Sequence, residues 1–229
     1  MRETMFVIFL VLICLGCSGT KPKKNDAPAA PSFLPEKDLR PVIVAFGDSL
    51  TAGQGVDPSL NYPAKLQTKM DAAGYRYRVV NAGVSGETSA QGLDRVQSIA
   101  ALHPAVVIVE FGANDGLRGI PAETTRQNLS AIVGRLQSDG AKVVVAGMEI
   151  PTNYGAPYTN SFHNIFPKLA KEYHASLIPF FLDGVGGRPG LNQEDGIHPT
   201  AEGYNIVVEN VWRVLRPLLK RSVPQEENS

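Results

Sequence analysis

Four short glycine-containing segments carry side chains that are typical of acyl-transfer enzymes, although they are spread over most of the chain. They lie at residues 45–53, 81–88, 111–115 and 195–199. Together they supply a serine hydroxyl, an asparagine carboxamide, an aspartate carboxylate, a histidine imidazole and several backbone amides. These are the groups needed to form and then hydrolyse an ester on a serine side chain.

Ser49, His198 and Asp195 fit the three parts of such a reaction. A serine hydroxyl is a weak nucleophile at neutral pH, so Ser49 needs a base that takes up its proton. Imidazole has an ordinary pKa of about 6.5, which suits His198 for taking up and returning that proton. Asp195 stands in the run Asp-Gly-Ile-His, so one loop can deliver both side chains. We expect its carboxylate to accept a hydrogen bond from the second imidazole nitrogen, which fixes the tautomer and stabilises the imidazolium.

The body of the chain alternates between strand and helix patterns, which predicts where these segments lie. Nearly continuous apolar runs such as VVIVEF and KVVVAGM are typical of strands that are buried on both faces of a parallel sheet. The predicted strands are 41–46, 77–81, 105–111, 142–148 and 176–181, and the predicted helices are 62–74, a segment after Thr88, 121–140, 161–173 and a segment from Thr200. This alternation predicts a doubly wound α/β fold, in which ligands bind at the carboxyl ends of the strands.

The four segments resemble, in order, the four sequence blocks of the SGNH, or GDSL, hydrolase family. The resemblance covers residues 41–217, and GDSLTAG, GVSGETSAQGL, GANDGLRG and DGIHP are similar to the bacterial periplasmic thioesterase/lysophospholipase and arylesterase branch. It implies a five-stranded parallel sheet flanked by helices, of the flavodoxin-like type. It also implies a serine acyl hydrolase that cleaves a small ester or thioester through an acyl-enzyme, as an arylesterase, thioesterase or lysophospholipase.

The resemblance further implies an oxyanion hole built from the backbone N–H groups of Ser49 and Gly83 and from the carboxamide of Asn114. Glycine at position 83 agrees with a backbone that must approach the reacting carbonyl closely. Ser85 is expected to be a loop or capping residue, and Asp48 a structural one. The sequence contains no H-E-x-x-H, P-loop or G-x-G-x-x-G motif, so we expect neither a metal nor a nucleotide cofactor.

A substrate groove is expected beside this site, from residues in the two loops that flank the predicted rim. They are Leu117, Ile120, Tyr154 and Tyr158. An apolar, partly aromatic groove suits an acyl chain, while ordinary loop packing is the alternative interpretation. Two other functions also stay open: a carbohydrate O-acetylesterase of the same superfamily, and a noncatalytic surface-binding lipoprotein. An O-acetylesterase would need only a small groove, because an acetyl group is short. The complete set of serine, aspartate and histidine argues against a noncatalytic protein.

The first forty residues indicate targeting and tethering. Residues 5–16 form an apolar run that suits a signal peptide and falls short of the roughly 20 residues of a transmembrane helix. The run ends in Cys14-Leu15-Gly16-Cys17, which is similar to a bacterial lipobox, although Cys14 stands where leucine is usual. We therefore expect a lipoprotein signal peptide over 1–16, acylation of Cys17 and a flexible tether over 17–40. A secretory signal cut elsewhere, or a retained anchor, is the alternative. Ser18 after the cysteine favours the periplasmic face of the outer membrane in the bacterial cell envelope.

Length and composition support the remaining predictions. Residues 41–220 suffice for one domain, which leaves 221–229 as a polar tail. The 22 basic and 22 acidic residues balance to a net charge of zero, so no nucleic-acid partner is expected. Cys14 and Cys17 are the two cysteines, which excludes a disulfide scaffold and a multi-cysteine zinc site. The oligomeric state is left open, with a monomer as the expectation.

Overall fold

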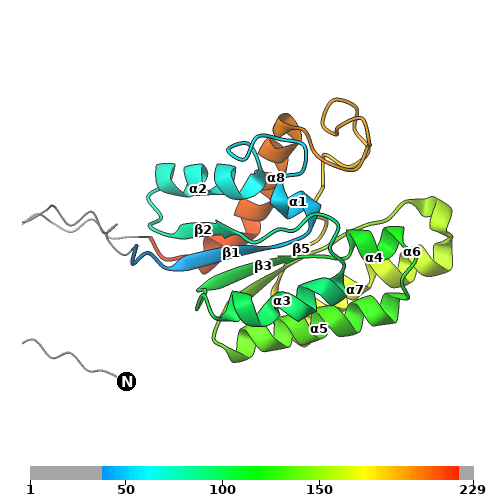
Figure 1. The fold of residues 1–229 in the computed structure, drawn as a ribbon, viewed down its shortest axis with the longest axis horizontal. Helices are drawn as coiled ribbons and strands as arrows, with labels where there is room; N and C mark the ends of the chain where they lie inside the picture. The colour runs from blue at the N-terminus through cyan, green and yellow to red at the C-terminus, as the bar shows by residue number, and fades with distance from the viewer. Residues whose placement is uncertain (1–37, 222–229) are drawn as a thin grey trace, which may run out of the picture. The chain divides into compact units, whose positions relative to one another are not determined.

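A five-stranded parallel sheet forms the centre of the fold in the computed structural model, which describes residues 38–221 (Figure 1). The strands are β1 (Val42–Gly47), β2 (Arg78–Asn81), β3 (Val106–Glu110), β4 (Lys142–Ala146) and β5 (Ser176–Ile178). Their order is β2-β1-β3-β4-β5, and all neighbours are parallel. This is the flavodoxin-like order of a doubly wound sheet, so the predicted fold class is confirmed. The predicted signal peptide, the tail after residue 221 and Cys17 lie outside the described residues.

Helices cover both faces of the sheet, which explains why its central strands are almost entirely apolar. The helices are α1 (Ser49–Ala52), α2 (Tyr62–Ala72), α3 (Ser89–Ala100), α4 (Ala113–Leu117), α5 (Ala122–Ser138), α6 (Ala156–His163), α7 (Ile165–Glu172) and α8 (Ala201–Leu215), with short 3₁₀ turns η1 (Thr152–Tyr154) and η2 (Arg216–Leu218). Helices α2 and α8 lie together on one face, and α3, α5 and α7 lie on the other (Figure 1). All five residues of β3 are buried, including the charged Glu110 at its end.

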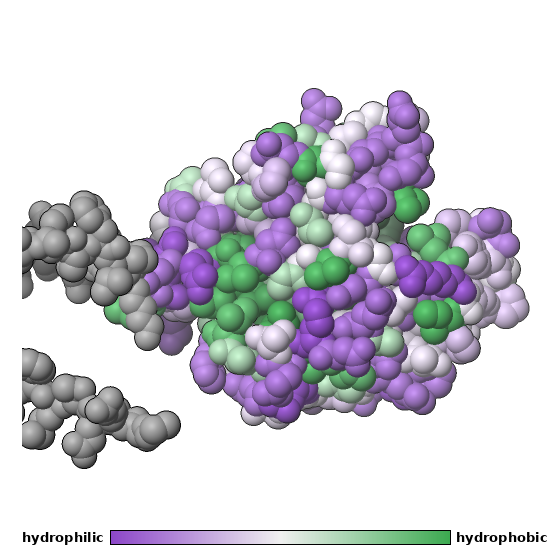
Figure 2. Space-filling model, viewed as in Figure 1, coloured by the Kyte–Doolittle hydropathy of each residue, from purple (hydrophilic) through white to green (hydrophobic). Residues whose placement is uncertain are grey.

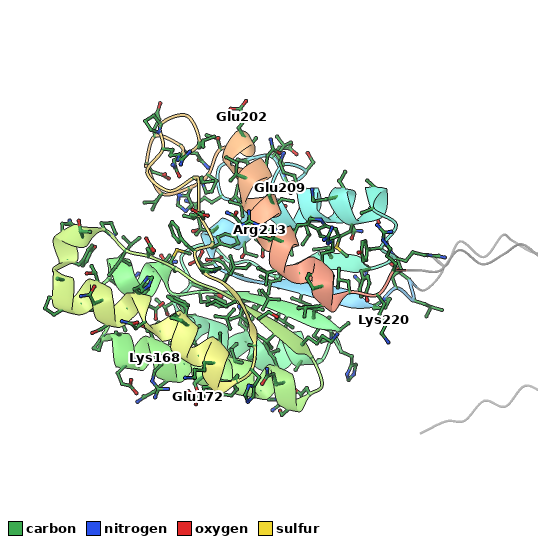
Figure 3. All side chains as sticks on the ribbon, turned by 180° about the vertical axis from the view of Figure 1, so that it is seen from behind. Lys168, Glu172, Glu202, Glu209, Arg213 and Lys220 are labelled. Atoms are coloured by element: carbon green, nitrogen blue, oxygen red, sulfur yellow. The ribbon has the colours of Figure 1, made fainter. Side chains whose placement is uncertain are left out.

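Helix α8 shows how amphipathic patterns place the helices. Val207 and Val211 are fully buried, as predicted from their spacing. Glu202, Glu209 and Arg213 are exposed along the same helix (Figure 3). The outer sides of α3 and α5 are likewise mostly hydrophilic, and apolar side chains gather between them and α2, over β1 and β2 (Figure 2). No helix within residues 38–221 is long and apolar enough to cross a bilayer.

Two predicted elements differ from the structure because of prolines. The helix expected over 161–173 is two helices, α6 and α7, which meet at Asn164. Pro167 has no N–H to donate to the carbonyl of His163, so one continuous helix would lose a hydrogen bond there. Strand β5 ends at Ile178 rather than at residue 181, because Pro179 cannot continue the ladder. The predicted loop that carries Leu117 and Ile120 contains the short helix α4.

Candidate active site

The four segments singled out in the sequence come together at the carboxyl-terminal edge of the sheet. Ser49 is the first residue of α1, directly after β1, and Asn114 lies in α4, after β3. The loop after β2 carries Gly86, and the connection from β5 to α8 carries Asp195 and His198. Because the carboxyl ends of parallel strands share one edge, residues far apart in the sequence meet here, where β1 and β3 lie side by side.

Ser49, His198 and Asp195 form a hydrogen-bonded chain. The distance from Ser49 Oγ to His198 Nε2 is 2.8 Å, and the distance from His198 Nδ1 to Asp195 Oδ2 is 2.7 Å. Ser49 and His198 are each 7% exposed, whereas the side chain of Asp195 is 43% exposed. Asp195 Oδ1 also accepts hydrogen bonds from the backbone N–H groups of Ile197 and His198, each at 3.0 Å. The loop therefore holds the carboxylate against the imidazole ring.

The same hydrogen bonds determine the charge of Asp195. The imidazole N–H of His198 lowers the pKa of Asp195 to about 2, and the backbone N–H groups of His198 and Ile197 act in the same direction. The carboxylate is therefore ionised at neutral pH and accepts the proton on Nδ1. That leaves Nε2 with a lone pair facing Ser49 Oγ, which is the tautomer required of a general base.

Contacts with other elements hold α1 in place, since a helix of four residues has little stability of its own. Asp48 Oδ1 caps the helix by accepting a hydrogen bond from the backbone N–H of Leu50 at 3.0 Å. From the opposite side of the turn, the hydroxyl of Tyr204 donates to the carbonyl of Leu50 at 2.9 Å. Gly53 ends the helix in the left-handed conformation, with φ of 84°. Ser49 is thus presented on a short turn that is fixed at both ends.

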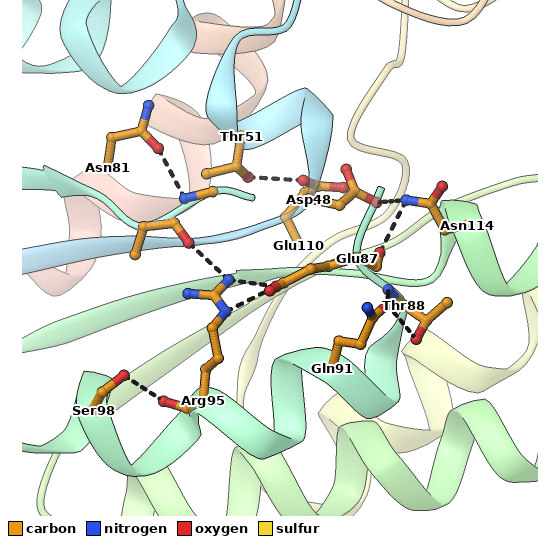
Figure 4. A network of polar contacts seen from close by, with 12 residues as sticks. Asp48, Thr51, Asn81, Glu87, Thr88, Gln91, Arg95, Ser98, Glu110 and Asn114 are labelled. Carbon is orange, nitrogen blue, oxygen red and sulfur yellow. Dashed lines mark hydrogen bonds and ion pairs between the residues drawn. The ribbon is translucent and has the colours of Figure 1, made fainter. Parts of the chain in front are cut away.

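Asn114 lies in the wall of the cavity beside Ser49 and is held by two acceptors (Figure 4). Its Nδ2 donates to the backbone carbonyl of Glu87 at 2.9 Å and to Asp48 Oδ2 at 3.2 Å. The first bond fixes the plane of the carboxamide. The second, at 3.2 Å, is at the long end of the usual N–H···O range of about 2.7–3.2 Å. This hydrogen can therefore be shared between Asp48 and a carbonyl oxygen in the cavity.

Gly83 does not lie where the family resemblance implied. Its N–H donates to Asn81 Oδ1 at 2.9 Å, and Gly83 is not among the residues that line the cavity beside Ser49. A Cβ atom at position 83 would lie 2.2 Å from the backbone nitrogen of Ala52, so glycine is required here for packing against α1. Gly86 in the same loop does line the cavity, and in the described part of the chain its N–H has no acceptor. The structure thus places Gly86, and not Gly83, beside the serine.

Two arginines tie the loop that carries Gly86 to its surroundings. Arg95 of α3 forms an ion pair with Glu87 and donates to the carbonyl of Ala82 at 3.1 Å (Figure 4). Arg118 donates to the carbonyl of Gly86 at 2.8 Å. These bonds hold both ends of the loop, so the free N–H of Gly86 is presented by a fixed backbone.

An apolar cavity of about 450 Å³ opens beside Ser49 and His198. Its apolar lining comes mainly from the loops after β3, β4 and β5, and consists of Leu117, Met148, Ile150, Pro151, Phe180, Leu182 and Ile197. Glu149 is the acidic residue in the lining. Burial of an apolar chain in such a cavity is favourable in proportion to the apolar area removed from water.

The predicted groove residues are only partly found in this cavity. Leu117 lines it, but Ile120, Tyr154 and Tyr158 do not. The tyrosine hydroxyls instead join the two loops, since Tyr154 donates to the carbonyl of Leu117 at 2.8 Å and Tyr158 donates to that of Ile120 at 2.6 Å. The alternative of loop packing therefore describes these three residues. The lining residues after β4 and β5 were missed because short apolar stretches beside a buried strand look like part of its core.

Within residues 38–221, no group of three or more His, Cys, Asp and Glu side chains is arranged to hold a metal ion. The site itself supplies hydroxyl, imidazole, carboxylate and amide groups.

The doubly wound sheet and this constellation of side chains at its edge define a hydrolase of carboxylic esters. The chain belongs to the GDSL-like lipase/acylhydrolase family, whose model matches residues 45–206.

Named relatives agree with this assignment. Esterase TesA of Pseudomonas aeruginosa is 42% identical over 188 residues, which are 82% of this chain and 94% of that protein. Thioesterase 1/protease 1/lysophospholipase L1 of Escherichia coli is 38% identical over 178 residues, covering 77% of this chain and 84% of the relative. The crystal structure of TesA superposes with a TM-score of 0.76 at 43% identity, covering 78% of this chain and 99% of that one.

Proposed function

We propose that this enzyme hydrolyses esters and thioesters of apolar acyl groups through an acyl-enzyme on Ser49. The observation that carries the proposal is the hydrogen-bonded chain from Ser49 through His198 to Asp195, with distances of 2.8 and 2.7 Å, at the mouth of an apolar cavity. The names of the relatives, which include an esterase, a thioesterase/lysophospholipase and an arylesterase, support an activity of this type.

In the proposed acylation step, His198 Nε2 takes the hydroxyl proton while Ser49 Oγ bonds to the carbonyl carbon of the substrate. The carbonyl oxygen becomes negatively charged and accepts hydrogen bonds from the backbone N–H groups of Ser49 and Gly86 and from the carboxamide of Asn114. His198 then gives its proton to the leaving alcohol or thiol as the C–O or C–S bond breaks. The acyl group remains on Ser49 as an ester.

Deacylation repeats these steps with water. His198 takes a proton from the water molecule as its oxygen attacks the acyl-enzyme, and returns that proton to Ser49 Oγ when the acid leaves. The ionised Asp195 stabilises the imidazolium in both half-reactions, because the two groups are in direct hydrogen-bond contact.

The cavity favours an acyl chain longer than acetyl. An acetyl group would leave most of the 450 Å³ without contacts, and the lining is predominantly apolar, which suits an acyl chain better than a sugar. A carbohydrate O-acetylesterase is therefore the weaker alternative. Rates measured on esters from acetyl to palmitoyl, and on a lysophospholipid, should rise with chain length beyond acetyl. Highest activity on acetylated sugars would favour the alternative.

Labelling with a fluorophosphonate tests the nucleophile directly. The parental enzyme should be labelled and lose its activity, and Ser49→Ala should be neither labelled nor active. Ser85→Ala is the matched control, because Ser85 is an exposed serine in a loop at the same edge of the sheet, and it should be labelled like the parent. Labelling that persists in Ser49→Ala would refute the assignment. A folded parental protein that is neither labelled nor active would instead indicate a noncatalytic surface-binding protein.

We also propose that the enzyme is anchored in the bacterial cell envelope through acylated Cys17, on the periplasmic face of the outer membrane. The support is the run Cys14-Leu15-Gly16-Cys17 after an apolar segment, followed by Ser18. Several acyl chains hold a protein firmly at a membrane, whereas a single chain does so only weakly. Cys17→Ser should move the enzyme from the membrane fraction to the soluble fraction. Equal membrane retention of both proteins would show that Cys17 is not the anchor.

A further inference from the structure

Two carboxyl groups lie fully buried directly beneath the proposed reaction centre. Asp48 follows β1 and Glu110 ends β3, and both are 0% exposed. The strands are neighbours, with Gly47 paired to Glu110, so the two side chains meet at the same edge of the sheet (Figure 4). A Cβ atom at Gly47 would lie 2.5 Å from Glu110 Oε2. Glycine at this position therefore leaves the space through which the Glu110 side chain passes under α1.

The hydrogen bonds of these two groups are unequal. Asp48 accepts at both oxygens, from the backbone N–H of Leu50 at Oδ1 and from Asn114 Nδ2 at Oδ2. Glu110 Oε2 accepts from the hydroxyl of Thr51 at 2.8 Å. Glu110 Oε1, in contrast, has no donor among the described residues. A buried carboxylate oxygen without a donor is costly, whereas a carboxylic acid satisfies its own O–H by donating to a neighbour.

No cation compensates the pair. In the part of the chain that the structure describes, neither carboxyl group forms an ion pair with a lysine or an arginine. The titratable and polar groups that face them are Thr51 of α1, Tyr62 of α2, Tyr204 of α8, and His198, which faces Asp48. Two adjacent buried carboxylates cannot both ionise without compensation, so one of them retains a proton at neutral pH.

The surroundings of the two groups favour Glu110 as the carboxyl group that retains the proton. Burial raises the pKa of Asp48 to about 6, and the hydrogen bonds from Leu50, Glu110 and Asn114 oppose that rise. Burial raises the pKa of Glu110 well above its ordinary value, and the nearby charge of Asp48 raises it further. Together with the two donors to Asp48 and the single donor to Glu110, these directions favour an ionised Asp48 beside a neutral Glu110.

We propose that Glu110 is a positioning residue of the active site, which donates a hydrogen bond as a neutral carboxylic acid to the Asp48 carboxylate. Asp48 in turn holds α1, which carries Ser49, and the carboxamide of Asn114. Because Glu110 is neutral, only one negative charge, that of Asp48, lies beneath the oxyanion hole. A second negative charge there would repel the oxyanion that forms during acylation. The catalytic consequence rests on the proposed function, whereas the position of the proton does not.

Glu110→Gln and Glu110→Ala test this inference together. Glutamine can donate to Asp48 and accept from Thr51 but cannot ionise. If Glu110 is neutral at pH 7, its ionisation should make parental kcat decline at alkaline pH. We expect Glu110→Gln to keep kcat within about threefold at neutral pH and to lack that decline, and a parental enzyme without an alkaline decline would also overturn the proposal. Glu110→Ala removes the donor, so kcat should fall about 10–100-fold while KM changes by less than about threefold.

Asp115→Asn is the matched control. Asp115 is a buried carboxyl group beside Asn114, but its hydrogen bonds come from Ser89 and Thr125 and not from Asp48. Asp115→Asn should keep the decline in kcat at alkaline pH, even if the variant is less stable than the parent. An alkaline decline that is unchanged in Glu110→Gln would overturn the proposal. If Glu110→Ala does not fold, the glutamine variant still decides the matter.

Infrared spectroscopy separates this inference from the proposed function. A protonated buried carboxyl group has a C=O stretching band apart from the bands of carboxylates. The parental protein at neutral pH should show this band, and Glu110→Gln should lack it. A band that is absent from the parent, or that persists in Glu110→Gln, would overturn the inference. Neither result depends on whether Ser49 is the nucleophile, which fluorophosphonate labelling tests separately.

Discussion

Replacing Asn114 by alanine should lower kcat about 10²–10³-fold and leave KM nearly unchanged. The carboxamide stands in the cavity wall beside Ser49. A carbonyl oxygen carries little charge in the bound ester and nearly a full charge in the tetrahedral intermediate. A hydrogen bond from Asn114 should therefore strengthen during the reaction, and its loss should affect turnover rather than binding.

The size of the effect follows from the two hydrogens on Asn114 Nδ2. The 2.9 Å bond to the carbonyl of Glu87 orients the group, and the second hydrogen, at 3.2 Å from Nδ2 to Asp48 Oδ2, can be shared with the oxyanion. Loss of one such donor typically costs about 2.7–4 kcal/mol of transition-state stabilisation. Alanine also leaves the Glu87 carbonyl and the Asp48 carboxylate without this donor, which should lower the free energy of unfolding by about 1–3 kcal/mol.

Kinetics measured well below the melting temperature separate the two effects. Asn114→Ala should still react with a fluorophosphonate, but more slowly, because Ser49 and His198 remain. Asn128→Ala is the matched control, since Asn128 donates a comparable hydrogen bond to Ser89 Oγ at 3.0 Å and does not line the cavity. It should lose stability with little change in kcat. A folded Asn114→Ala enzyme with near-parental kcat would remove Asn114 from the oxyanion hole and refute this reasoning.

Four further predictions concern the surrounding groups. Activity should fall as acidification protonates His198, and because the pKa of Asp195 is lowered to about 2 this decline cannot come from Asp195. A His198→Ala variant whose residual activity keeps the same acidic decline would assign that decline to another group, of which Asp48, with its pKa raised to about 6, is the nearest. Asp195→Asn should lower kcat by up to about 10⁴-fold, since the amide favours the wrong imidazole tautomer, and stopped-assay kinetics on the folded variant would show it. Leu117→Ala should reduce kcat/KM for long acyl esters by about 10-fold with little effect on acetyl esters, whereas Tyr158→Phe, whose hydroxyl lies outside the cavity, should leave the chain-length profile unchanged. Because burial raises the pKa of Glu110, the native state binds the proton of Glu110 more tightly than the unfolded chain does. The free energy of unfolding should therefore fall as pH rises through the raised pKa. Urea titrations at several pH values should show a weaker dependence of this free energy on pH for Glu110→Gln.

The architecture could be predicted from the sequence because its signals are local. Runs such as VVIVEF indicate strands that are buried on both faces, and the alternation with helices implies parallel crossovers whose carboxyl ends share one edge. From that rule, together with the family resemblance, Ser49, Asn114 and His198 were expected at one site, and the structure brings them together. The loop from Asp195 to His198 was also predictable, because both side chains stand within one tight turn.

Finer assignments within the site depended on which way a backbone or side chain points. Gly83 and Gly86 stand in one loop and look equivalent in the sequence. Only the packing of Gly83 against α1, and its hydrogen bond to Asn81, show that its N–H is turned away from the cavity. Tyr154 and Tyr158 likewise suit an aromatic groove by composition, yet their hydroxyls are used to join two loops.

The class of fold, the four segments that meet and the groups they supply could be read from the amino-acid order, because hydrophobic periodicity is a property of neighbouring residues. The free N–H groups, the side chains that line the cavity and the shared buried environment of Asp48 and Glu110 depend on packing between distant segments. In the sequence, Glu110 is a single charged residue at the end of an apolar strand. Its proton and its role depend on the strand register that sets it beside Asp48, and on the helices that exclude water from both.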